Sequence, residues 1–90
     1  MSTKLDELVG KEIVIDTDSR FCYIGNAAGY DEHFIELKDV AIYDEMVVKV
    51  SLEEFLVECN KNGTPVSRGK TLVNRGRIIA ISTIEDIVLV

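Results

Sequence analysis

Residues 72–81 contain two short apolar runs on either side of the sequence Asn74-Arg75-Gly76-Arg77. The leucine, valine and isoleucine side chains of both runs are typical of β-strands. Gly76 tolerates a positive φ, so a tight connection here would point a cation outward between two fixed strands. The sequence therefore predicts paired final strands over residues 70–74 and 77–82. Arg75 at their connection is the first indication of function.

The chain has 90 residues, of which 47% are hydrophobic, and this length suits one small domain with a packed core. So short a chain buries a modest fraction of its surface, and self-association would add to that burial. The net charge of −6 argues against a free-standing nucleic-acid binder. The charge is unevenly distributed, however, because residues 61–84 contain five cations and no acid. A polyanion would meet this segment first.

The two cysteines, Cys22 and Cys59, lie far apart in dissimilar contexts and form no CxxC pattern. Each is predicted to be a small buried hydrophobe with a free thiol, as in proteins of a reducing compartment. No stretch has the length of a membrane span, and the first residues lack the pattern of a signal peptide. The expectation is a soluble, cytoplasmic protein without a membrane partner.

The first half of the chain is predicted to form a short helix and a series of strands. Ser2 or Thr3 can cap the helix, and Gly10 ends it. Alternating apolar side chains predict strands over residues 11–17, 20–26 and 33–43, with a short fourth apolar run over 46–50. Gly25 indicates a β-bulge or a sharp bend, and residues 27–32 either continue the strand or turn. Bent antiparallel strands of this kind indicate a small barrel.

The second half is predicted to contain another helix, over about residues 52–60. Ser51 and Glu54 form a capping box, apolar residues recur at helical spacing, and Gly63 supplies the stop. The final segment, residues 84–90, fits either an edge strand or a helix-like tail, and its pattern favours neither.

The order of these features resembles the Sm-like (LSm) family. Two motifs carry the resemblance: Leu5-x-x-Leu8-Val9-Gly10-Lys11 with the later Gly25 and Asp31, and Asn74-Arg75-Gly76 before Ile78. Together they cover residues 5–44 and 70–82, more than half of the chain. The resemblance implies a mainly β fold, a small and strongly bent five-stranded antiparallel barrel related to SH3-like and OB-like barrels. An N-terminal helix precedes the barrel, and the predicted second helix is extra.

The resemblance also implies a single Sm-like domain over residues 1–90, in which residues 44–69 form an insertion. It implies a homo-oligomeric ring of about five to seven subunits, closed by pairing an edge strand of each subunit with the next. Such pairing would use strand edges that are otherwise open to aggregation. The inserted helix would cover one face of the ring or change how the subunits meet.

Single-stranded RNA commonly lies on rings of this family, with one base stacked in each subunit. By resemblance, the RNA-binding residues here are His33, Arg75, Gly76 and Asp31. His33 and Arg75 would stack on the base, and Asp31 would brace the loops. Stacking with a cation contributes about 1–3 kcal/mol per base, and a ring multiplies the effect. Ile35 stands where the family has an asparagine that reads the base edge, which argues against specific recognition of uridine.

Two functions remain open from the sequence. The first is a ring-forming RNA-binding protein, and the second is a structural or protein-interaction ring that has kept the fold and lost RNA binding. His33 also fits a hydrogen-bonded structural residue, and Arg75 a solvated turn cation. No enzyme is expected, because the acids are scattered, no serine lies in a strained elbow and no glycine loop cradles a phosphate. Neither a metal site nor a cofactor is predicted.

Overall fold

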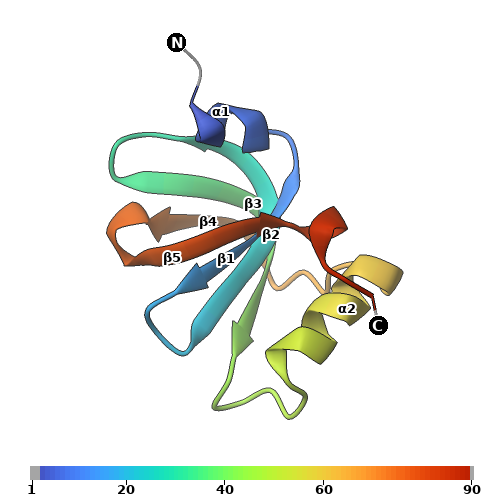
Figure 1. Cartoon of the computed structure of the whole chain (residues 1–90). Helices are drawn as coiled ribbons and strands as arrows, with labels where there is room; N and C mark the ends of the chain where they lie inside the picture. The colour runs from blue at the N-terminus through green and yellow to red at the C-terminus, as the bar shows by residue number, and fades with distance from the viewer. Residues whose placement is uncertain (1–2, 90) are drawn as a thin grey trace.

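The computed structural model describes residues 3–89, which form one five-stranded antiparallel sheet with two α-helices and two short 3₁₀ turns (Figure 1). In chain order the elements are α1 (Lys4–Leu8), β1 (Glu12–Thr17), β2 (Phe21–Tyr30), β3 (Phe34–Asp44), α2 (Leu52–Asn62), β4 (Arg68–Asn74), η1 (Arg75–Arg77), β5 (Ile78–Thr83) and η2 (Ile84–Asp86). The predicted mainly β class, the N-terminal helix and the second helix are confirmed.

The strands lie in the order β4-β3-β2-β1-β5, so β4 and β5 form the two edges of the sheet. β4 pairs with β3, and β5 pairs with β1. The predicted terminal hairpin is therefore wrong, although both segments are strands. Only the three residues of η1 separate them, so the sheet must bend until its two edges approach each other at this end. The resulting barrel is open along the seam between β4 and β5.

Irregular pairing between β2 and β3 produces much of this bend. The register shifts at two places, between Ile24 and Asn26 and between Ala27 and Gly29. A Cβ on Gly25 would lie 3.1 Å from both the Lys38 carbonyl oxygen and Val40 Cγ2, so β3 passes too close for a side chain. The bulge predicted at Gly25 is confirmed, since an irregular pair increases local twist and bending. β2 then continues as far as Tyr30.

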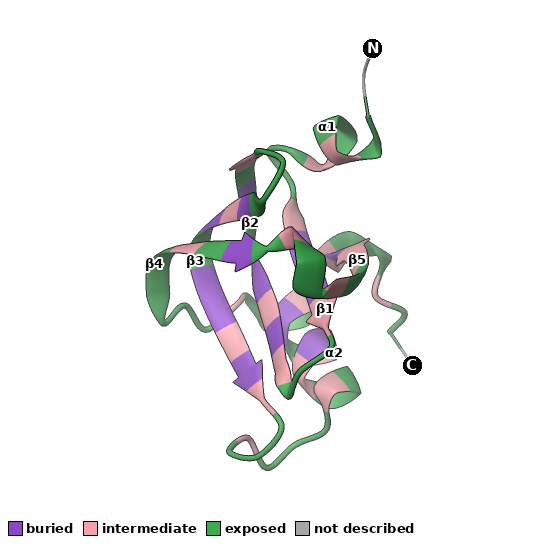
Figure 2. Cartoon of the chain, turned by 90° about the vertical axis from the view of Figure 1, so that its left-hand side faces the viewer, coloured by how far each residue is buried: buried purple, intermediate pink, exposed green. Residues whose placement is uncertain are grey.

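Buried side chains fill both faces of the sheet, as the purple central parts of the strands indicate (Figure 2). One cluster contains Ile13, Ile15, Ala27, Ile35, Leu37, Val40 and Val73, with α1 packed against it through Leu5 and Leu8. The other contains Val14, Cys22, Ile24, Ala41, Tyr43 and Leu56. Neighbouring residues of a strand point to opposite faces, so Val14 lies opposite Ile13 and Ile15. α2 therefore closes a second core on the far side of the sheet.

Both helices begin at side-chain caps. Thr3 Oγ1 accepts the Asp6 amide, and Asp6 in turn accepts the Thr3 amide, which completes a capping box at α1; Ser2 lies outside the described residues. Ser51 Oγ accepts the Glu54 amide at 3.2 Å at the start of α2. Gly63, with φ of +92°, ends that helix. α2 thus runs two residues beyond its predicted end.

Two terminal or connecting segments differ from the sequence patterns. Residues 46–50 form no strand, because the Asp44 carbonyl accepts the amides of Val47 and Val48 and turns the chain immediately after β3. After β5, the chain forms η2, and Ile84 and Ile87 pack against the cluster under α2. Of the two alternatives, the helix-like tail is the nearer one, because Ile84–Asp86 form a 3₁₀ turn and residues 84–89 contain no strand; Val90 lies outside the described residues.

Cys22 and Cys59 are both buried, as predicted. Burial raises the pKa of the Cys22 thiol, and the nearby Asp16 carboxylate raises it further. Burial likewise raises the pKa of Cys59. Neither thiol has the depressed pKa of a reactive cysteine.

Candidate nucleic-acid interface

The β2–β3 loop and η1 lie side by side at one end of the sheet. β3 begins where its neighbour β4 ends, and Phe34 pairs with Asn74 in the antiparallel register. The Arg75 amide extends this pairing by donating to the His33 carbonyl at 2.8 Å. Topology thus brings together two loops that are far apart in the sequence.

Asp31 organises the β2–β3 loop. Its Oδ1 accepts the amides of His33 and Phe34, both at 2.8 Å, and its own amide donates to the Phe34 carbonyl at 2.9 Å. The two bonds to the carboxylate hold the pKa of Asp31 below its ordinary value, and the charges of His33 and Arg75 act in the same direction. The carboxylate therefore fixes the path of the chain on which His33 is carried.

Arg75 is half-buried between the two loops. Its guanidinium Nη1 donates to the Asp31 carbonyl. Its Cζ lies 5.7 Å from the ring centroid of Tyr30, within the range of a cation–π contact. Arg75 is thus held from two sides, by a backbone acceptor and by an aromatic face.

The His33 side chain is 75% exposed, and its Nε2 lies 3.8 Å from Glu32 Oε1. Among residues 3–89, that carboxylate is the only ionic partner of the imidazole. An exposed imidazole is open to a stacking ligand, and it fits poorly with the alternative interpretation of a structural, hydrogen-bonded histidine. His33 and Arg75 therefore belong to neighbouring loops that a backbone hydrogen bond joins.

Gly76 does not have the positive φ that the sequence analysis allowed for it. Within residues 3–89, glycines with positive φ are Gly10 and Gly63, and Gly76 is not among them. The Asn74 side chain caps η1 by accepting the Gly76 amide at 2.8 Å, and a Cβ on Gly76 would lie 3.2 Å from Asn74 Oδ1. The close approach of this cap, rather than a left-handed backbone, favours glycine here.

Ile35 lies in the core with an exposed fraction of 3%. Its neighbours in β3, Phe34 and Glu36, point to the opposite face because strand side chains alternate. Ile35 therefore has neither a polar group nor access to a ligand, and no base-edge contact comes from this position.

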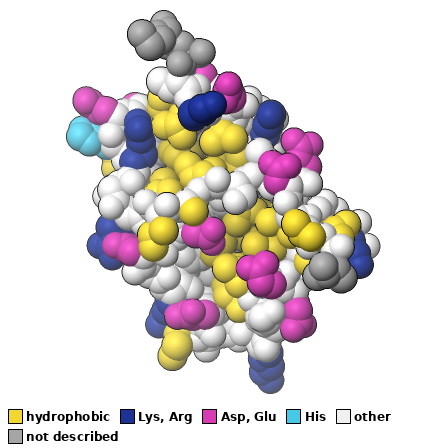
Figure 3. All heavy atoms as spheres, viewed as in Figure 1, with side chains coloured by type: hydrophobic (Ala, Val, Ile, Leu, Met, Phe, Trp, Pro, Cys, Tyr) yellow, Lys and Arg dark blue, Asp and Glu magenta, His cyan; other side chains and the backbone are white. Residues whose placement is uncertain are grey.

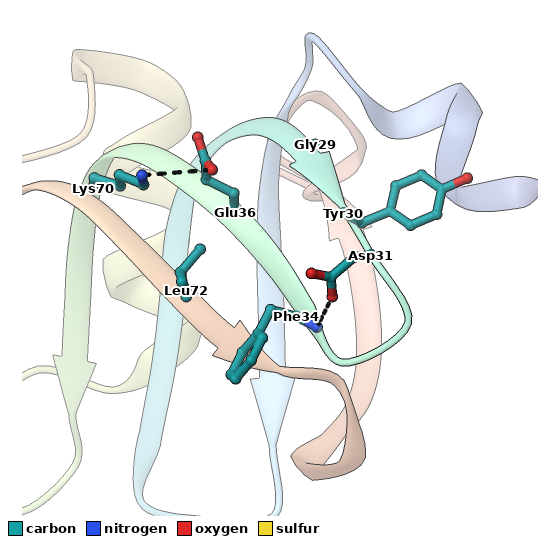
Figure 4. A pocket seen from close by; sticks show the side chains of 7 residues that line it. All are labelled: Gly29, Tyr30, Asp31, Phe34, Glu36, Lys70 and Leu72. Carbon is teal, nitrogen blue, oxygen red and sulfur yellow. Dashed lines mark hydrogen bonds and ion pairs between the residues drawn. The ribbon is translucent and has the colours of Figure 1, made fainter.

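A hollow of about 250 Å³ lies beside the same loop (Figure 4). It is lined by Gly29, Tyr30, Asp31, Phe34, Glu36, Lys70 and Leu72. Gly29 pairs with Glu36 and supplies no side chain, which leaves the space open. Glu36 Oε1 and Lys70 Nζ form an ion pair at 3.7 Å on one side, and Phe34 and Leu72 provide the apolar lining. Two of its lining residues, Lys70 and Leu72, belong to the edge strand β4.

The basic segment, residues 61–84, is partly neutralised by acids from elsewhere in the chain. Arg77 Nε donates to Asp18 Oδ1 at 2.8 Å, a contact that raises the pKa of Arg77, and Lys70 pairs with Glu36. Cations and acids are interspersed on the face of the molecule in Figure 3, and the cyan side chain of the chain's one histidine lies at the upper left. These contacts leave no continuous basic surface along the segment. Arg75 is one of its cations that forms no ion pair among residues 3–89.

Among residues 3–89, no group of three histidine, cysteine or acidic side chains converges as a metal-binding cluster. None of the helices in this part of the chain is long and apolar enough to cross a membrane.

Sequence reasoning predicted Asp31, His33, Arg75 and Gly76 as site residues, and the structure brings these four into two adjoining loops. It gave Tyr30 no role and did not predict the cap that Asn74 forms. Tyr30 lies in the segment 27–32, for which strand and turn were both open, and only its place in three dimensions shows the contact with Arg75. Asn74 stands in the second motif, and its cap could have been predicted from its type, because asparagine often caps turns with its side chain.

No family model matches the sequence, and no curated protein matches it. Solved structures do match. An Sm protein from Pyrococcus abyssi, in complex with a uridine heptamer, aligns with a TM-score of 0.60 over 88% of this chain and 90% of that chain, at 18% identity. An Sm-like protein from Archaeoglobus fulgidus aligns with a TM-score of 0.60 over 92% of this chain and 96% of that chain, at 14% identity. The chain has an Sm-like fold.

The Sm-like fold confirms the resemblance drawn from the two sequence motifs. The alignments cover 90% and 96% of the two matched chains. At identities below 20% the Sm-like fold alone is established, and function has to be argued from the residues at its loops.

Proposed function

We propose that this protein forms an Sm-like ring that binds single-stranded RNA, with a base stacked against His33 and Arg75 of each subunit. The observation that carries the proposal is the junction of the two loops. The Arg75 amide bonds the His33 carbonyl, and the Arg75 guanidinium bonds the Asp31 carbonyl. A planar imidazole and a planar guanidinium from separate loops are thereby kept at one end of the sheet.

Stacking is the chemistry that these two side chains have in common. Every nucleobase has a π-face, so stacking on histidine and arginine is tolerant of sequence and contributes about 1–3 kcal/mol per base. Ile35 is buried and offers no hydrogen bond to a base edge. The proposed site therefore accepts oligo-U and oligo-A with similar affinity, which distinguishes it from a uridine-specific one.

The free edges of β4 and β5 support the proposed ring. Within residues 3–89 each of these strands has one partner only, and they lie at opposite ends of the sheet order. Pairing β4 of one subunit with β5 of the next repeats one interface and closes a ring, here of about five to seven subunits. Leu72 on β4 is 53% exposed and Ile79 on β5 is 70% exposed, so both edges carry apolar surface that assembly would bury.

A titration with labelled oligo-U and oligo-A over a range of salt concentrations tests the proposal. The wild-type ring should bind both with micromolar or tighter affinity and lose affinity as salt rises. Arg75→Ala should weaken binding about tenfold or more, because it removes a stacking partner at every subunit. Arg68→Ala is the matched control: it also removes one cation from the basic segment, and it should have little effect.

The second candidate function is a structural or protein-interaction ring without RNA binding. The net charge of −6 and the neutralisation of Arg77 and Lys70 favour it. A protein that runs as a ring by light scattering and binds neither oligonucleotide at low salt would select this function. In both cases we propose a non-enzymatic protein of the cytoplasm, with residues 1–90 as a single Sm-like domain and 44–69 as its insertion. The RNA-binding form would be part of a ribonucleoprotein.

A further inference from the structure

Tyr30 contacts two separate parts of the molecule through the two ends of its side chain. Its hydroxyl donates to Asp6 Oδ1 and lies 3.1 Å from Thr3 Oγ1, at the first turn of α1. Its ring face lies under the Arg75 guanidinium, with 5.7 Å between Arg75 Cζ and the ring centroid. One side chain thus joins the N-terminal helix to the arginine of η1.

The contact at the hydroxyl strengthens the contact at the ring. A phenol that donates to a carboxylate becomes richer in electrons, and hydrogen bonds in a chain polarise one another. The face of an electron-rich ring attracts a cation more strongly. The same hydrogen bond holds the pKa of Asp6 below its ordinary value, so the acceptor stays ionised at neutral pH. The tether also fixes the ring in place, because its far end is bound to the helix.

Asp6 serves α1 and Tyr30 with different oxygens. Oδ2 accepts the Thr3 amide at 2.8 Å and completes the helix cap, while Oδ1 accepts the Tyr30 hydroxyl. A single carboxylate thereby orders the start of α1 and the ring on which Arg75 lies. The N-terminal helix is thus connected to Arg75 through the Tyr30 side chain.

We propose that Tyr30, tethered by α1, is a positioning residue that holds one face of the Arg75 guanidinium so that the opposite face is presented to a base. The part of this inference that concerns a base rests on the proposed function. The part that concerns the pose of Arg75 does not, because it can be measured in the protein without RNA. The ligand class is an unpaired nucleobase, whose π-face fits the free side of the guanidinium.

The first measurement is ¹⁵N relaxation of the Arg75 Nε–Hε group in the RNA-free protein. In the wild type this group should be more restricted than that of Arg68, which forms no ion pair among residues 3–89. Tyr30→Leu removes the ring and should raise the mobility of Arg75 toward that of Arg68, without reaching it, because the Asp31 carbonyl still accepts from Nη1. Tyr30→Phe keeps the ring and loses its tether, so it should give an intermediate value. Tyr23→Phe, which removes a tyrosine hydroxyl elsewhere on β2, is the matched control and should change nothing.

The second measurement is affinity for oligo-U. Tyr30→Leu should weaken binding about two- to fivefold, the effect of losing one exposed cation–π contact. Tyr30→Phe should weaken it less. The slope of affinity against salt should remain that of the wild type in both variants, because neither changes a charge that faces phosphate. A general loss of folding would instead shift the melting temperature and the assembly mass together.

The outcomes separate the two proposals. If Arg75 is as mobile as Arg68 in the wild type, or is unaffected by Tyr30→Leu, the positioning role is overturned even where RNA binds. If the wild type binds no RNA, the proposed function fails, and with it the presentation of Arg75 to a base. Should Tyr30→Leu fail to fold, Asp6→Asn replaces it. That variant keeps an oxygen for the Tyr30 hydroxyl and removes its negative charge, and the proposal requires it to increase Arg75 mobility.

Discussion

Asp31 and Gly76 shape the two loops of the candidate site through hydrogen bonds to residues close in the sequence. Two backbone amides converge on one carboxylate oxygen of Asp31, and an asparagine cap closes against the bare Cα of Gly76. The resemblance to the Sm-like family predicted both residues. It did not predict that Gly76 would have an ordinary φ, because the need for glycine came from the Asn74 side chain, whose position the sequence does not specify.

The lowered pKa of Asp31 leads to a pH-dependent prediction. A carboxyl group whose pKa is lower in the folded state stabilises the fold at pH values above its unfolded pKa of about 4, and this contribution is lost as pH falls through the folded pKa. Wild type should therefore exceed Asp31→Asn in stability at neutral pH, and the difference should vanish in acid. Urea unfolding at a series of pH values measures it.

The neighbouring substitution Glu32→Gln is the control for Asp31→Asn. The Glu32 side chain accepts no backbone hydrogen bond from the described residues, and its contact is the exposed imidazole of His33. A pH-dependent difference of equal size in the two variants would contradict the role assigned to the backbone hydrogen bonds of Asp31.

Among the elements, α2 is one whose position in the sequence could be predicted, whereas its packing partner could not. The cap at Ser51, the apolar spacing and the stop at Gly63 predicted the helix to within two residues. They did not show which surface it covers. Alternation in a strand is compatible with burial of Ile13 and Ile15 on one face, but Val14 between them is also buried because α2 covers the other face.

The pairing partners of the final strands could not be predicted from the sequence for a related reason. Alternation identified both final strands, but it contains no information on their partners. Two predicted strands joined by Arg75 and Gly76 suggested a hairpin, and the bend of the sheet placed them at opposite edges instead. Residues 46–50 were misjudged similarly, since an apolar run gives no sign of the turn that Asp44 starts.

Substitution of Leu56 tests whether α2 is part of the cooperative fold. Leu56 has an exposed fraction of 4% and packs in the cluster between α2 and the sheet. Leu56→Ala should lower the free energy of unfolding by about 2–5 kcal/mol, the range for a leucine removed from a packed core. Val57→Ala, one position along and partly exposed, should cost less than about 1 kcal/mol. Equal, small losses in urea unfolding would show that α2 merely rests on the sheet.

At the scale of the whole molecule, the open seam between β4 and β5 is the dominant feature. It leaves two strand edges and their apolar side chains, Leu72 and Ile79, exposed on a chain of 90 residues. Exposed edges of this kind are a liability for a monomer. The proposed ring resolves it by joining unlike edges of successive subunits.

Charged substitutions at the two edges test this mode of assembly. Leu72→Glu and Ile79→Lys should each give monomers by light scattering, since each blocks one side of a repeating interface. Their equimolar mixture should contain a dimer, because one intact β4 edge can still meet one intact β5 edge. Val88→Glu, at another strongly exposed apolar position, should leave the assembly mass unchanged. Larger assemblies in either edge variant would argue against pairing of β4 with β5.

The three residues of η1 connect the two edge strands, β4 and β5, and include Arg75 of the candidate site. In a ring, β4 would pair with the neighbouring subunit on one side, and β5 would pair with the neighbouring subunit on the other side. Strain at either junction would then be transmitted to the same short connection. Assembly and ligand binding would then act on the same short segment, and any effect of assembly on ligand affinity would be matched by an equal effect of the ligand on assembly.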